Sequence, residues 1–161
     1  MTAATTFDKT SMRHALATLA YRCGKTLRGA TPAFANFREN ATSRSPCEIL
    51  AHIGDLLEWA HWLAKGEPKW SNAEPLPWED EVARFYSLLA RFDAQLAADA
   101  EIAAPLDALF QGPVADALTH VGQLAMLRRL AGEPMKGENY FKAEIVVGRV
   151  GPDQTAPKRE F

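Results

Sequence analysis

One amphipathic helix can be recognised directly in residues 45–63, SPCEILAHIGDLLEWAHWL. Ser45 and Glu48 have the spacing of a capping box, and Pro46 takes the first helical position, where its missing N–H costs nothing. Gly66 supplies the residue that commonly follows the last helical turn. The side chains that share one face of this helix are mostly apolar: Ile49, His52, Leu56, Trp59 and Leu63. This face therefore predicts a helix packed against other helices, with a histidine inside the contact.

Prolines and glycines divide the remaining chain into three more segments with helical periodicity. These segments are about Asp8–Leu27, Pro77–Leu96 and Gly112–Ala131. Two short helical turns are expected in the connections, at Ala33–Arg38 and Leu106–Phe110. Four amphipathic helices of about 20 residues, each about 30 Å long, predict an all-α fold, an up-down-type four-helix bundle.

The length of 161 residues predicts a single domain, residues 1–161. Its helical core is expected at about residues 8–133, with a C-terminal extension at about 134–161. Within this extension, Ile145–Val150 is β-branched and short, so it is either a strand fragment or part of a short extended tail packed across the bundle. Pro152–Phe161 is expected to be a loosely held terminus.

Composition excludes several classes of function. The net charge is −2, from 18 basic and 20 acidic residues, so no strong positive field exists to bind nucleic acid. No apolar run approaches the ~18 residues of a membrane span, and the first residues do not have the pattern of a signal peptide. The two cysteines, Cys23 and Cys47, do not form a Cys-x-x-Cys motif, and reduced thiols are expected. The expected location is the cytoplasm.

Asp116 and His120 are the first candidates for metal ligands. On a helix, residues four apart lie about 40° apart in azimuth and about 6 Å apart along the axis, so both side chains can reach one cation. A third ligand must come from another helix, and His52 is the best-placed candidate. Three protein ligands leave a coordination position open, which favours a site for chemistry over a purely structural one. Two alternatives remain open: each histidine can be a hydrogen-bonded core residue, and Asp116 can cap a helix that begins at Pro113.

Other ligand-type side chains fit the site less well. His14 has no acidic partner at helical spacing, and His61 lies half a turn around the helix from His52, so it is expected at the surface or at an interface. Two carboxylates near His52 could serve as a general base. Glu48 is expected to be occupied by its capping box, which leaves Asp55 as the other nearby carboxylate.

The two motifs Pro46-Cys-Glu-Ile-Leu-Ala-His52 and His120-Val-Gly-Gln123 resemble the DinB/YfiT-like superfamily of bacterial four-helix-bundle metalloproteins, over roughly residues 8–133. The resemblance implies a divalent metal ion held by three histidines, one matching His52 and two matching Asp116 and His120. The first histidine of that pair is replaced here by Asp116. Because aspartate also binds zinc and nickel, the resemblance implies that either ion could be bound.

The resemblance also implies a function. It suggests a metal-dependent thiol transferase or hydrolase acting on an unidentified small molecule, with a low-molecular-weight thiol as one candidate. The alternative is a non-catalytic binding or stress-related helical module without a functional metal. A homodimer is expected from the resemblance together with aromatic residues in excess of what the core needs, such as Phe34, Trp62 and Trp70.

Overall fold

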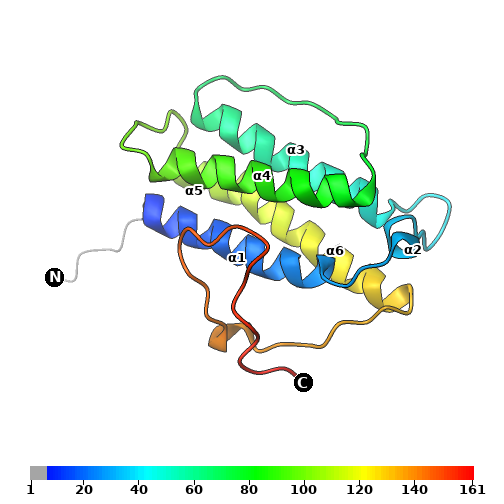
Figure 1. Cartoon of the computed structure of the whole chain (residues 1–161). Coiled ribbons are helices and arrows are strands. Elements are labelled where there is room, and N and C mark those ends of the chain that lie inside the picture. Colours follow the sequence, from blue (N-terminus) through cyan, green and yellow to red (C-terminus); the bar gives the residue numbers. More distant parts are fainter. Residues whose placement is uncertain (1–6) are drawn as a thin grey trace.

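The computed structural model describes residues 7–161, which form helices joined by loops and contain no strand over that range (Figure 1). The long helices are α1 (Lys9–Leu27), α3 (Pro46–Ala64), α4 (Trp78–Ala97) and α6 (Ala115–Leu130). The short helical segments are α2 (Pro32–Ala35), α5 (Leu106–Leu109), the π-helical turn η1 (Phe110–Val114) and the 3-10 turn η2 (Tyr140–Lys142). The all-α class and the four long helices are therefore confirmed. No helix within residues 7–161 combines the length and the apolarity needed to cross a membrane.

Capping residues fix where the helices begin. In α3, the hydroxyl of Ser45 accepts a hydrogen bond from the backbone N–H of Glu48, and the carboxylate of Glu48 accepts one from the N–H of Ser45. In α1, Asp8 accepts from the N–H of Ser11. Gly66 follows α3 with φ 77°, a left-handed conformation that glycine adopts without strain. The capping box predicted from the sequence is thus present in full.

Helix α3 lies between α4 and α6, and α1 contacts the same two helices from the other side. Figure 1 shows these four helices running side by side. The facing surfaces of the four helices are apolar. Their fully buried side chains include Leu16, Leu19, Ile53, Leu57, Phe85, Phe92 and Leu124. Burial of these faces supplies the main driving force for the fold.

The fourth long helix differs from the prediction at its start. The sequence placed its beginning at Gly112-Pro113, but α5, η1 and α6 follow one another without a gap, so the chain is helical from Leu106 to Leu130. Pro113 has no N–H to give to the helical ladder, and it lies inside the wider π turn. A π turn of this kind accommodates a local break in the i→i−4 pattern while the helix continues.

The C-terminal extension follows a path along α1 (Figure 1). Residues Ile145–Val150 form no strand, so of the two interpretations only the extended tail agrees with the structure. The expectation of a loose end at Pro152–Phe161 is wrong: the backbone of Phe161 donates to Gly137, and Glu160 pairs with Lys25 at 3.0 Å.

Glu138 is the main polar anchor of this tail. Its carboxylate accepts a hydrogen bond from the Tyr21 hydroxyl and lies 2.7 Å from the ammonium of Lys25, with Glu138 0% and Lys25 6% exposed. Burial, followed by the contact with Glu138, raises the pKa of Tyr21, so this phenol stays protonated and donates. The tail is therefore fixed to α1 by a buried network whose partners, Lys25 and Glu138, are 113 residues apart in the sequence.

We expect Glu138→Gln to lower the free energy of unfolding by about 3 kcal/mol, because it removes one partner of a buried ion pair. Urea denaturation followed by circular dichroism measures the change. Glu144→Gln is the matched control, since Glu144 pairs with Lys158 at the surface, where such pairs contribute little. Equal stability of Glu138→Gln and the wild type would show that the anchor does not stabilise the fold.

Candidate functional site

The three predicted ligands lie together where α3 meets α6. One ligand atom from each of His52, Asp116 and His120 lies within 4.8 Å of the other two. The carboxylate of Asp116 is 3.5 Å from Nε2 of His120 and 3.9 Å from Nε2 of His52. Two ligands of one tetrahedral zinc ion are separated by about 3.4 Å, as bonds of about 2.0–2.2 Å require. The observed cluster is therefore close to the spacing that a single cation needs.

Asp116 does not cap a helix. Because the helix continues through η1 and α5, the N–H groups beside Asp116 belong to a continuous helix rather than to a free end. No side chain makes a capping hydrogen bond at the start of α6. The capping alternative is therefore wrong, and the carboxylate of Asp116, which is half-exposed, faces the two histidines instead.

Gln123 orients His120 from one turn further along α6. Its side-chain oxygen lies 2.8 Å from Nδ1 of His120. In the tautomer with the proton on Nδ1, this nitrogen donates to Gln123, and the lone pair of Nε2 is left on the side of Asp116. A partner of this type typically fixes a metal-binding histidine. Sequence reasoning assigned no role to Gln123, although its i+3 spacing from His120 was the available signal.

His52 is half-buried between aromatic rings. Its ring packs edge-to-face on His120, with centroids 4.8 Å apart, and on Trp70, with centroids 5.9 Å apart. Burial lowers the pKa of His52, and the neighbouring His120 ring and Arg44 guanidinium lower it further. His52 is therefore neutral near pH 7, which is the state in which an imidazole nitrogen can act as a ligand.

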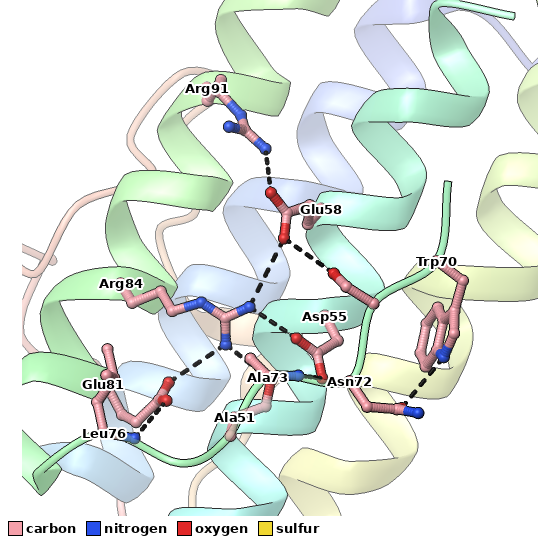
Figure 2. Close-up of polar contacts among 11 residues, drawn as sticks. Ala51, Asp55, Glu58, Trp70, Asn72, Ala73, Leu76, Glu81, Arg84 and Arg91 are labelled. Atoms are coloured by element: carbon pink, nitrogen blue, oxygen red, sulfur yellow. Dashed lines mark hydrogen bonds and ion pairs between the residues drawn. The ribbon is translucent and has the colours of Figure 1, made fainter. Parts of the chain in front are cut away.

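A partly buried arginine, Arg84, connects α4 to α3 close to His52. The guanidinium of Arg84 lies 2.7 Å from the carboxylate of Asp55 and donates to the backbone oxygen of Ala51 at 3.1 Å. It also lies 3.5 Å from the buried carboxylate of Glu81 (Figure 2). Gly54 permits this approach, because a Cβ at that position would lie 2.7 Å from Nη1 of Arg84. Asp55 is thus committed to Arg84.

The same carboxylates hold the loop that connects α3 to α4. The N–H of Ala73 donates to Asp55 at 3.2 Å, and the N–H of Leu76 donates to Glu81 at 3.0 Å. Figure 2 shows this loop running from Trp70 past Asp55 toward Glu81. Because the loop is fixed at these points, the indole of Trp70 stays against His52.

The remaining ligand-type residues lie apart from the cluster. His61 is buried, which contradicts its predicted place at the surface; burial and the charges of Arg91 and Lys65 lower its pKa. The thiol of Cys47 donates to the backbone oxygen of Leu76, and burial raises its pKa. The carboxylate of Glu48 is occupied by its capping box and by Arg38, which lies at 2.6 Å.

Two pockets flank the cluster. One, of about 450 Å³, opens beside His120 and has mainly apolar walls. The other, of about 360 Å³, opens beside His52 and is mainly polar. A larger cavity of about 630 Å³ lies elsewhere, between the start of α1 and Val147, and His14 is the one ionisable side chain among its described lining residues. The paired pockets therefore mark the region around the three ligands as the better candidate for chemistry.

Comparison of the chain with models of known protein families, with curated proteins and with solved structures gives no significant match. The resemblance to the DinB/YfiT-like superfamily consequently rests on the sequence motifs around His52 and His120 alone.

We expect Arg84→Met to lower the free energy of unfolding by about 3 kcal/mol, because it leaves the buried carboxylates of Asp55 and Glu81 without their cation. It should also speed proteolytic cleavage within the loop of residues 65–77, which would lose its anchors. Urea denaturation and limited proteolysis measure the two effects.

The control for Arg84→Met is Arg91→Met, on the same helix. Arg91 is 41% exposed and pairs with Glu58 at 3.4 Å, so its loss should cost less than about 1 kcal/mol. If both variants lost equal stability and the loop kept its resistance to protease, Arg84 would have no special role in holding it.

Proposed function

We propose that this chain binds one divalent metal ion, zinc or nickel, through His52, Asp116 and His120. The observation that carries the proposal is the convergence of two imidazoles and one carboxylate within 4.8 Å, from two different helices. Nitrogen and oxygen donors of these types suit both ions, and three protein ligands leave a further position for water or substrate.

The surroundings of the three side chains support this proposal. Gln123 favours the tautomer of His120 with Nδ1 protonated, and burial keeps His52 neutral, so both rings can present a lone pair. Trp70 covers one side of His52 and limits the access of water. When bound, a metal ion in such a site lowers the pKa of a bound water or thiol, or polarises a carbonyl group.

The proposal extends to a DinB-like bundle of the up-down type and to a cytoplasmic enzyme. The reaction would be transfer of a low-molecular-weight thiol or hydrolysis of a small molecule. Support comes from the open pockets on both sides of the three ligands and from the motif resemblance. In either reaction, the role of His52, Asp116 and His120 is to fix the reacting group beside these pockets.

One observation favours the alternative, a non-catalytic binding or stress-related module. The two carboxylates closest to His52 along α3 are both engaged: Glu48 with Ser45 and Arg38, and Asp55 with Arg84 and Ala73. Neither is free to act as a general base. A protein that only binds metal and ligand needs no such base.

Metal binding is tested by titrating zinc and nickel into metal-free protein. We expect one ion per chain, and we expect His120→Ala to abolish binding. Gln123→Ala should weaken binding about 10- to 100-fold, because the partner of a ligand is lost. Zinc should raise the melting temperature of the wild type by mass action, and chelator should reverse the shift.

The control for the metal titration is His14→Ala, which removes an exposed histidine on α1 outside the cluster. It should bind zinc like the wild type. Loss of binding in His14→Ala, or stoichiometric binding retained in His120→Ala, would show that the ion is held elsewhere.

We also propose a homodimer, and among Phe34, Trp62 and Trp70 the exposed side chain is that of Trp70. Two of the aromatic residues from which the dimer was predicted have contacts within the protein. Phe34 is buried in the core against Trp78, and the ammonium groups of Lys65 and Lys69 lie over the ring of Trp62. Trp70 is 45% exposed and still contacts His52.

Sedimentation at micromolar concentration tests the dimer. We expect a species of twice the chain mass, because twofold dimers are the commonest oligomers. A single species near the chain mass of 17.7 kDa would reject it.

A further inference from the structure

Arg44 lies beside the proposed metal site and has no ion-pair partner among residues 7–161. It lies directly before the capping box of α3, and its side chain is exposed. Within residues 7–161, no carboxylate lies within 4.0 Å of its guanidinium, and no hydrogen bond from it is present. An arginine has five donors in a planar fork, which fits a carboxylate, so such a group beside a pocket is available to a ligand.

The neighbouring arginines differ from Arg44 because each has partners within the protein. Arg38 contacts Glu48 and donates to the backbone oxygen of Ser43, each at 2.6 Å. Arg84 is partly buried and pairs with the carboxylates of Asp55 and Glu81. Among the arginines near His52, Arg44 is therefore the one without a carboxylate or carbonyl contact in the described part of the chain, residues 7–161.

The location of Arg44 connects it to both pockets. It lines the apolar pocket that contains His120 and the polar pocket that contains His52. An anionic group bound to Arg44 would consequently lie next to the three proposed ligands.

The walls of the pocket beside His120 are suited to an apolar chain. Ile49 from α3 and Leu127 from α6 are buried beneath it, and Met126 is 56% exposed at its edge. Methionine adapts its shape to different apolar partners, because its side chain is unbranched and flexible. Volumes of about 300–1,000 Å³ are typical of small-molecule sites, and this pocket, at about 450 Å³, lies within that range.

We propose that this pocket binds a small organic carboxylate with an apolar chain. The carboxylate pairs with Arg44, the chain lies over Ile49, Met126 and Leu127, and the molecule ends beside His120 and Gln123. The inference rests on the proposed function in one respect, because it names the substrate class of the proposed metal site. The pairing with Arg44 itself requires no metal.

Hexanoate is the probe, titrated by calorimetry into the full chain after chelator treatment and again after zinc loading. We expect it to bind the metal-free protein, and to bind more tightly than acetate, which lacks the apolar chain. Hexan-1-ol has the same chain without the charge and should bind more weakly. Arg44→Gln should weaken hexanoate about tenfold or more, since a charge-assisted bidentate contact is lost.

The matched control is Arg129→Gln, which removes the same charge from an exposed arginine of α6 that donates a hydrogen bond to the backbone oxygen of Ala125. It should leave hexanoate binding unchanged. Three results would each overturn the proposal. The first is an equal effect of Arg44→Gln and Arg129→Gln on hexanoate binding, and the second is equal affinity for hexan-1-ol and hexanoate. The third is hexanoate binding that requires zinc and is unchanged in Arg44→Gln. Absence of hexanoate binding in both the metal-free and the zinc-loaded protein would also overturn it. Equal binding of inorganic phosphate and hexanoate would overturn it as well, because the apolar chain of hexanoate would then contribute nothing to affinity.

Zinc titration of Arg44→Gln keeps the two proposals separate. Arg44 is not one of the proposed ligands, so this variant should bind zinc like the wild type. If the wild type bound no zinc but bound hexanoate through Arg44, the metal proposal would fail while the carboxylate pocket would stand.

Discussion

Packing on both sides of α3 is the constraint on which the site depends. His52 and Asp55 are three residues apart, so they leave the helix about 60° apart in azimuth. One reaches α6 and the other reaches α4. Gly54 lies between them and lets Arg84 approach the backbone of α3. Contacts with α4, on a face about 60° around α3 from His52, therefore help to hold the helix that presents the imidazole to α6.

The π turn before α6 serves the same site from the other helix. A helix that began at Pro113 would place Asp116 in its first turn, where the free N–H groups attract a carboxylate. Continuation of the helix back to Leu106 removes this competing role. It also carries η1 against α3, so the two helices are held together close to the point where Asp116 meets His52. The π turn thus leaves the half-exposed carboxylate of Asp116 next to His52 and His120.

Side-chain positions that depend on the geometry of one helix could be predicted from the sequence. Contacts between residues that are far apart in the sequence could not. The spacing of Asp116 and His120 follows from helical geometry, and the place of His52 follows from its apolar neighbours. The role of Gln123 was equally local, but an amide side chain is too common at i+3 to single out. Arg84 and Glu138 could not be assigned, because their partners lie 29 and 113 residues away along the chain. Local spacing along the sequence does not show which of several distant charged residues will meet.

Charge balance connects the carboxylate of Asp116 with the guanidinium of Arg44. A divalent cation held by two neutral imidazoles and the carboxylate of Asp116 would leave a net charge of about +1, where three imidazoles would leave about +2. The lower charge would attract an anionic ligand less strongly. Arg44 places a further positive charge beside the same pockets, and no carboxylate among residues 7–161 pairs with it. Recognition of an anion would then depend on an arginine outside the metal's coordination shell, which can select the ligand without changing the ion.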